Sequence, residues 1–144
     1  MKFKFIFGSI VVVCLLSLFL VPMVYSNSSP TYKVIEVKDG DTIVIEHPDT
    51  FYQNPSIRLY GVDTPESYRP KCDLEKQMGE KAKQFIKTTL KSNKNIITLG
   101  KIDKDKYGRI LTTVYVDGKD LSKLLIKNGL AREYFGDKKQ SWCN

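Results

Sequence analysis

Apolar and polar residues alternate along three stretches in the first half of the chain, which is the pattern of half-buried β-strands. An Asp-Gly pair separates the first two stretches, and this dipeptide favours a tight reversal of the chain. A loop from His47 to Pro55, which holds two prolines, separates the second stretch from the third. We therefore predict a meander of three strands, over residues 32–37, 42–45 and 56–62.

The second half of the chain begins with a different period. Between residues 73 and 91 apolar side chains recur at every third or fourth position, and Lys and Glu fill most of the rest. This spacing predicts an amphipathic helix. A second, shorter helix should begin at Asp120, whose side chain can cap it. The remaining predicted elements are two alternating strands and a short extension, at residues 95–99, 110–116 and 130–135.

The order of three strands, helix, two strands, helix and extension predicts an α+β fold that is mainly β. It fits a five-stranded closed OB-fold barrel with two helices packed outside, although other α+β domains have the same order. The chain has 144 residues, which is enough for one such domain, over residues 27–144.

Residues 1–26 have the character of an export segment. Lys2 and Lys4 precede a stretch from Phe5 to Tyr25 that contains no charged residue. A basic start, an apolar centre and small residues at the end are typical of a secretory signal, which we expect to be cut after Ser26. The alternative is a retained membrane anchor, because the apolar stretch is close to the length that spans a bilayer. Both interpretations place a monomeric domain outside the cytoplasm, either secreted, periplasmic or membrane-anchored.

The net charge of the chain indicates a type of binding partner. The chain has 23 basic and 16 acidic residues. Removal of Lys2 and Lys4 with the signal would leave 21 basic residues and a net charge of +5. A basic surface favours polyanions, of which nucleic acid is the commonest. Because many basic proteins bind no nucleic acid, charge alone does not decide the function.

Three polar clusters stand at the ends of predicted strands, where side chains can meet over the mouth of a barrel. They are Asp39 to Thr42, Arg58 with Asp63 to Glu66, and Asp103 to Arg109. Phosphodiester cleavage needs an activated water, a cation and fixed donors for the charge of the transition state. Carboxylates can meet the first two needs, and the arginine fork meets the third. Because the sequence offers carboxylates and no cluster of Cys and His, the expected metal is a hard one such as calcium.

Two of the clusters also have a purely structural interpretation. Asp39-Gly40 can be no more than a hairpin turn, and Asp63-Thr64-Pro65-Glu66 resembles the cap, proline and acid that begin many helices. Taken singly, neither cluster separates catalysis from local structure.

Three segments together resemble the signature of the thermonuclease family, also called staphylococcal-nuclease-like. They are Asp39-Gly40-Asp41-Thr42, Arg58-Leu59-Tyr60-Gly61-Val62-Asp63-Thr64-Pro65-Glu66 and Asp105-Lys106-Tyr107-Gly108-Arg109, followed by a matching Asn128-Gly129-Leu130-Ala131. The resemblance covers about residues 32–135. It implies an OB-fold barrel and calcium-dependent attack of water on DNA and RNA, with 3′-phosphate products.

The resemblance also implies a role for each matching residue. Calcium would be bound by the carboxylates of Asp41 and Asp63 and by the backbone carbonyl of Thr64. Glu66 would be the general base or would orient the attacking water. The residues that would hold phosphates are Arg58 and Arg109 at the scissile group, and Lys106 and Tyr107 at a neighbouring one.

The chain departs from this family near its C-terminus. Well-known members continue into another helix, whereas only nine residues follow Phe135 here. Cys72 lies just after the predicted active loop and Cys143 near the end of the chain. In an oxidising compartment these two form an even pair, once Cys14 leaves with the signal, so we expect a disulfide. Two separate thiols or an intermolecular bridge are the alternatives.

A nucleic-acid-binding module is the rival to the nuclease hypothesis, because OB-folds commonly hold single strands without cleaving them. The sequence retains a set of acids and arginines for which a module that only binds has no use: Asp41, Asp63, Glu66, Arg58 and Arg109. It therefore favours catalysis.

Overall fold

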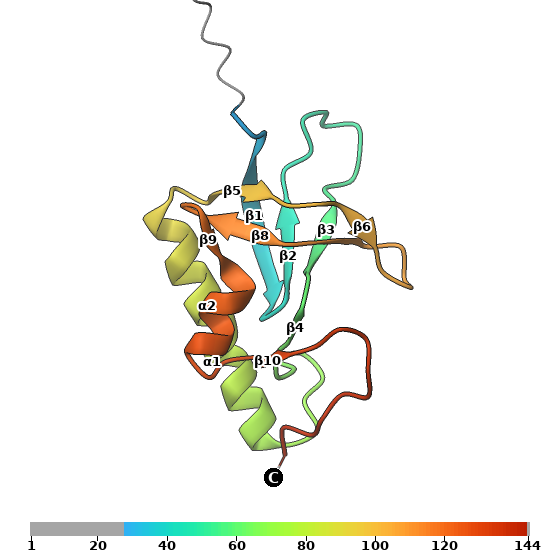
Figure 1. The fold of residues 1–144 in the computed structure, drawn as a ribbon, viewed down its shortest axis with the longest axis vertical. Helices are drawn as coiled ribbons and strands as arrows, with labels where there is room; N and C mark the ends of the chain where they lie inside the picture. The colour runs from blue at the N-terminus through green and yellow to red at the C-terminus, as the bar shows by residue number, and fades with distance from the viewer. Residues whose placement is uncertain (1–27, 144) are drawn as a thin grey trace, which may run out of the picture.

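The computed structural model describes residues 28–143 (Figure 1). The predicted signal or anchor segment lies outside these residues. In the part of the chain that the structure describes, no helix has the length and apolar character needed to cross a membrane.

The predicted meander forms the centre of the sheet. Strand β1 (Thr31–Asp39) pairs antiparallel with β2 (Thr42–Ile45), which pairs antiparallel with β3 (Ser56–Leu59). Gly40 in the first turn does not have a left-handed backbone, so its role differs from the one that the Asp-Gly pair predicts.

The third strand ends earlier than its pattern predicts, because Gly61 turns the chain. Its φ of +76° is in the left-handed region that favours glycine. After this turn, β4 (Val62–Asp63) leaves the main sheet and pairs with β10 (Arg132–Glu133). Asp63 is thereby placed beside the C-terminal segment.

The main sheet has eight strands, and its hydrogen-bonded order, β6-β7-β3-β2-β1-β5-β8-β9, has two free ends. The five further strands are β5 (Ile96–Leu99), β6 (Asp103–Lys104), β7 (Ile110–Thr112), β8 (Val114–Val116) and β9 (Lys119–Asp120). The predicted strand 110–116 is interrupted at Thr113: β7 pairs with β3 and β8 pairs with β5. Because the two end strands of this order, β6 and β9, do not pair with each other, the sheet does not close into a barrel. The prediction of a five-stranded closed barrel is therefore wrong in strand number and in closure for residues 28–143.

Two helices pack against the curved sheet (Figure 1). The first, α1 (Asp73–Ser92), buries Ala82, Ile86 and Leu90, and the second, α2 (Leu121–Lys127), is capped by the Asp120 carboxylate as predicted. The core between helices and sheet is aliphatic. Its most deeply buried members are Ile43, Ile57, Leu59, Val62, Ala82, Ile86, Ile97, Val114, Leu121 and Leu125.

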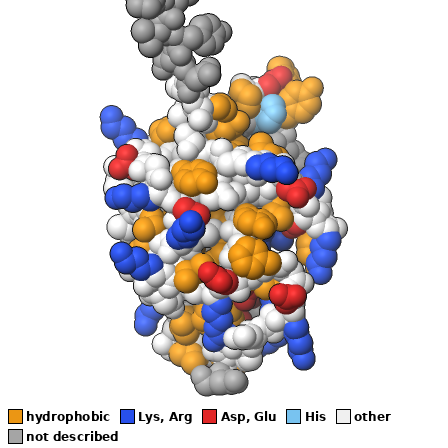
Figure 2. All heavy atoms as spheres, viewed as in Figure 1, with side chains coloured by type: hydrophobic (Ala, Val, Ile, Leu, Met, Phe, Trp, Pro, Cys, Tyr) orange, Lys and Arg blue, Asp and Glu red, His pale blue; other side chains and the backbone are white. Residues whose placement is uncertain are grey.

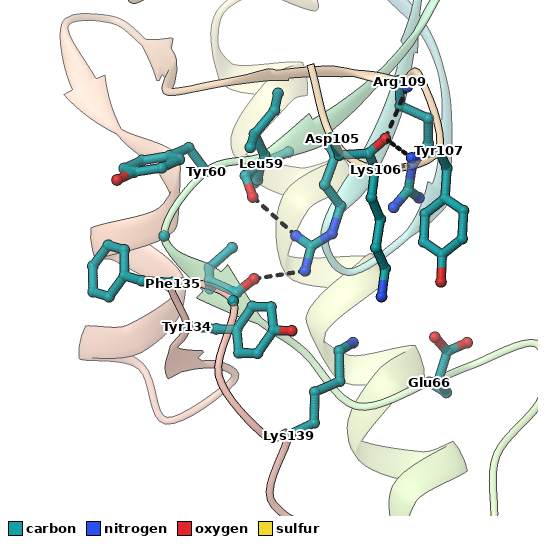
Figure 3. A pocket seen from close by; sticks show the side chains of 15 residues that line it. Leu59, Tyr60, Glu66, Asp105, Lys106, Tyr107, Arg109, Tyr134, Phe135 and Lys139 are labelled. Atoms are coloured by element: carbon teal, nitrogen blue, oxygen red, sulfur yellow. Dashed lines mark hydrogen bonds and ion pairs between the residues drawn. The ribbon is translucent and has the colours of Figure 1, made fainter. Parts of the chain in front are cut away.

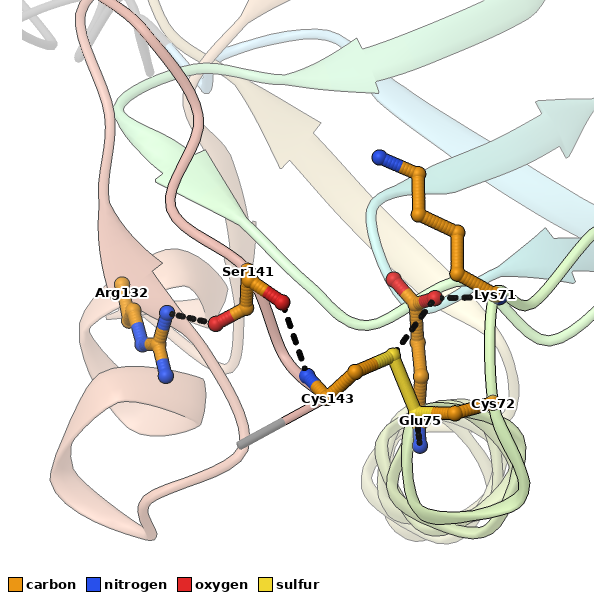
Figure 4. Close-up of a disulfide and its surroundings, with 6 residues drawn as sticks. All are labelled: Lys71, Cys72, Glu75, Arg132, Ser141 and Cys143. Carbon is orange, nitrogen blue, oxygen red and sulfur yellow. Dashed lines mark hydrogen bonds between the residues drawn. A yellow bond between two sulfur atoms is a disulfide. The ribbon is translucent and has the colours of Figure 1, made fainter.

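The C-terminal segment, residues 134–143, is fixed at both ends. Cys143 forms a disulfide with Cys72, the N-cap residue of α1 (Figure 4). Near the bridge, the guanidinium of Arg132 stacks 3.8 Å above the Trp142 ring and donates a hydrogen bond of 2.9 Å to the Ser141 carbonyl. Trp142 is 8% exposed, so the end of this segment packs against the domain without a helix, whereas residues 135–141 are exposed.

Lys and Arg side chains are spread over the face seen in Figure 2, with fewer Asp and Glu side chains between them. This distribution agrees with the basic composition of the chain.

Candidate active site

A cleft of about 500 Å³ opens where the turn after β3, the β6–β7 loop and the C-terminal segment meet (Figure 3). Basic and aromatic side chains line most of it, and Glu66 stands at one end. Of the predicted site residues, the cleft brings together Arg58, Glu66, Lys106, Tyr107 and Arg109.

Arg58 is held rigidly on β3. Its side chain donates to the carbonyls of Leu59 at 2.9 Å and Val62 at 2.7 Å, and its Nη2 lies 3.1 Å from Asp41 Oδ2. Arg58 and Asp41 are both 8% exposed. A guanidinium has five N–H donors, so Arg58 keeps donors for a ligand while these contacts fix its orientation.

Arg109 is held by its own loop. The Asp105 Oδ2 atom accepts from Arg109 Nε at 2.6 Å, and Asp105 Oδ1 accepts from the backbone N–H groups of Tyr107 and Arg109, each at 2.9 Å. Although partial burial acts against it, hydrogen bonding to Arg109 lowers the pKa of Asp105 below its ordinary value. Asp105 therefore remains a charged anchor for the loop that carries Lys106 and Tyr107.

Glu66 is exposed at the end of the cleft, on the loop between β4 and α1. Partial burial of its carboxyl group raises the pKa of Glu66, and the nearby carboxylates of Asp39 and Asp41 raise it further, while Lys139 opposes the shift. A raised pKa brings a carboxylate closer to the proton affinity that a general base needs near neutral pH.

The three predicted calcium-binding residues lie outside this cleft. Asp63 and Thr64 line an adjacent hollow, which shares Glu66 and Lys139 with the cleft, and Asp41 faces Arg58. Both oxygens of Asp63 meet the C-terminal segment: Lys139 Nζ lies 2.5 Å from Oδ1, and Trp142 Nε1 donates to Oδ2 at 3.2 Å. Burial works against the charge of Lys139, but Asp63 outweighs it and raises the pKa of Lys139.

The donor atoms here fit a calcium ion in kind. They are hard oxygens, and the hydroxyl oxygen of Thr64 is buried without a hydrogen-bond partner among residues 28–143. In arrangement they fit less closely, because within this range no three His, Cys, Asp or Glu side chains converge as a metal centre. The ammonium of Lys139 takes the position beside Asp63 that a cation would need.

Two glycines hold the acidic loop close to its neighbours, and sequence reasoning missed their roles. A Cβ atom on Gly79 of α1 would lie 2.8 Å from backbone atoms of Pro65, Glu66 and Ser67. A Cβ atom on Gly40 would lie 2.7 Å from the Thr64 hydroxyl oxygen. Such distances are far below ordinary contact. The loop therefore approaches α1 at Gly79, and Thr64 approaches the β1–β2 turn at Gly40, only because these two positions lack side chains.

Comparison with known proteins shows the family of this chain. The family model for staphylococcal nuclease homologues matches residues 56–142. A thermonuclease from Staphylococcus hyicus is 41% identical over 105 residues, which cover 73% of this chain and 60% of that protein. The chain belongs to the staphylococcal nuclease family.

Other relatives in the family have similar identities. A thermonuclease from Staphylococcus intermedius is 37% identical over 105 residues, again covering 73% of this chain and 60% of that protein. Endonuclease YncB of Bacillus subtilis is 40% identical over 95 residues, covering 65% of this chain and 43% of that protein. The alignments thus span about 60% of the thermonucleases and less of the endonuclease.

Within this staphylococcal nuclease domain, the C-terminal segment adds site residues that the sequence did not reveal. Tyr134, Phe135 and Lys139 line the cleft, and Trp142 contacts Asp63. The available signal was the pair of cysteines, because a bridge from Cys72 to Cys143 carries the intervening tail back to the acidic loop. The bridge predicted from the sequence places the tail beside the segment that follows Glu66, but it does not show which residues of the tail line the cleft.

Proposed function

We propose that this chain is an exported, calcium-dependent nuclease that hydrolyses phosphodiester bonds in DNA and RNA. The observation that carries the proposal is a single cleft that is lined by Glu66, Arg58 and Arg109 together. These are the groups that an in-line attack on a phosphate requires: an acceptor for the proton of water and fixed cations for the developing charge. The names of the relatives, thermonuclease and endonuclease, support the same activity.

In the proposed reaction, Glu66 takes a proton from a water molecule while the oxygen of that water attacks phosphorus. The bond from phosphorus to the 5′ oxygen breaks, leaving a 3′-phosphate on one fragment and, after protonation, a 5′-hydroxyl on the other. Arg58 and Arg109 donate to the phosphate oxygens, and Lys106 adds charge at the neighbouring phosphate. A calcium ion held by Asp41, Asp63 and the Thr64 carbonyl would offset the charge of the scissile phosphate.

Export and a monomeric state are part of the proposal. The disulfide between Cys72 and Cys143 supports a location outside the cytoplasm, because such bonds persist in oxidising compartments. Residues 1–26 would direct export, either as a cleaved signal or as a membrane anchor. The mass of the exported protein distinguishes these two forms.

Calcium removal should abolish cleavage. We expect the purified chain to degrade plasmid DNA and RNA with calcium, to lose this activity in a calcium chelator, and to regain it when calcium is restored, because the proposed ligands are hard oxygens. Gel electrophoresis of the products measures the effect. Equal cleavage in the chelator would rule out calcium dependence, and binding of nucleic acid without cleavage would favour the binding module.

Asp105→Asn should reduce turnover roughly 10- to 100-fold, because an uncharged amide holds Arg109 less firmly and small displacements of a positioning group are costly. Asp103→Asn is the matched control: Asp103 is exposed on β6, two residues before Asp105, and its carboxylate accepts only a local hydrogen bond, from the Lys104 N–H. Steady-state kinetics on a defined oligonucleotide compares the two. Equal rates for both variants would show that Asp105 does not position Arg109.

A further inference from the structure

The C-terminal segment occupies the acidic side of the site. Lys139 and Trp142 between them contact both carboxylate oxygens of Asp63, whose side chain is 7% exposed. Lys139 also lines the cleft that holds Glu66 and the hollow that holds Thr64. One ammonium group therefore stands among the oxygens proposed to bind a divalent cation.

This position is built into the domain. The disulfide at Cys143 (Figure 4) and the stacking of Arg132 on Trp142 fix the segment just beyond Lys139. The Lys139 side chain itself is 50% exposed, so it can move into solvent without displacing the segment. Trp142, in contrast, is buried and donates to the other oxygen, Oδ2, so it can keep Asp63 oriented when Oδ1 is released.

An ammonium group and a divalent cation cannot share Asp63 Oδ1 at contact distance, since each needs the same lone pairs and the two charges repel. We propose that Lys139 is an internal competitor of the divalent cation: its ammonium group must leave Asp63 before calcium binds. The proposal rests on the calcium site of the proposed function. In this proposal Lys139 sets the affinity for the cation. The apparent affinity decreases as the fraction of molecules in which Asp63 is free of Lys139 decreases.

The test is a calcium titration of the full domain without nucleic acid. Trp142 is the only tryptophan in the chain and contacts Asp63, so its fluorescence can report binding, with calorimetry as the second readout. We expect Lys139→Gln to tighten the calcium Kd by on the order of ten-fold or more, since it removes a repelling charge at contact distance. Lys139→Arg, which keeps the charge, should stay near wild type. Lys138→Gln makes the same change of charge one residue away and should also stay near wild type.

The outcomes separate the two proposals. If wild type binds calcium and Lys139→Gln binds it equally well, the competition is disproved and the calcium site stands. If neither protein binds calcium, the calcium site fails and the competition fails with it.

A measurement on the unmodified protein guards against a variant that folds poorly. Calcium should release the Lys139 amine and increase its rate of acylation by an amine-reactive ester, while the rate at Lys138 stays constant. Mass spectrometry of the peptides measures both rates. An unchanged or slower rate at Lys139 with calcium bound would overturn the proposal.

Discussion

Replacing Glu66 with Gln is expected to lower turnover by roughly 10²- to 10⁴-fold, the usual contribution of a general base. The melting temperature should change little, because the Glu66 side chain is exposed and its negative charge is repelled by the nearby carboxylates of Asp39 and Asp41. Removing that charge therefore breaks no stabilising ion pair with them. Steady-state kinetics and thermal denaturation of the same preparation measure the two effects. Glu80→Gln, at an exposed position of α1, is the control.

The pH dependence gives a second readout for Glu66. Because protonation of Glu66 removes the proton acceptor, activity of the wild type should fall on acidification. This acidic limb should be missing from the residual activity of Glu66→Gln. Wild-type turnover in the variant would remove Glu66 from the mechanism.

Arg58→Ala is expected to damage both catalysis and stability. Loss of a fixed donor to the phosphate should reduce turnover by roughly 10²- to 10³-fold. The substitution also leaves Asp41 as a buried charge without its partner, and breaking such a pair destabilises a protein by about 3 to 5 kcal/mol. Assays below the melting temperature, together with denaturant unfolding, separate the two losses.

Arg109→Ala is the informative comparison for Arg58. The Arg109 side chain is 36% exposed and pairs with Asp105 on its own loop, so turnover should fall to a similar extent with a much smaller loss of stability. If both arginine variants proved equally unstable, the assignment of a separate structural role to Arg58 would be incorrect.

Much of the fold could be predicted from local sequence pattern. The amphipathic period gave both bounds of α1 to within one residue, and Asp120 caps α2. Strand breaks were harder to predict, because they depend on single residues within an apolar pattern. Gly61 and Thr113 interrupt two stretches that alternate without a gap, and hydrogen bonding to different neighbours then separates each stretch into two strands.

Only the part of the candidate site that is formed by local motifs could be predicted from the sequence. Motifs locate residues that lie near one another in sequence, and those on the loop 105–109 and around Arg58 do line one cleft. Contacts between distant segments leave no local pattern. The ion pair of Lys139 with Asp63 joins residues 76 positions apart, and the need for Gly79 arises from the approach of another loop.

The disulfide has a consequence for biosynthesis. Cys143 follows every helix and strand of the described domain, whereas Cys72 precedes α1, so Cys72 emerges well before its partner. Until Cys143 is synthesised, Cys72 is an unpaired thiol that can exchange with other thiols and disulfides. A chain that stops before Cys143 would keep this reactive group and could form mixed disulfides, whereas a chain with the bridge would not. The bridge thus couples the chemical inertness of Cys72 to synthesis of the chain as far as Cys143.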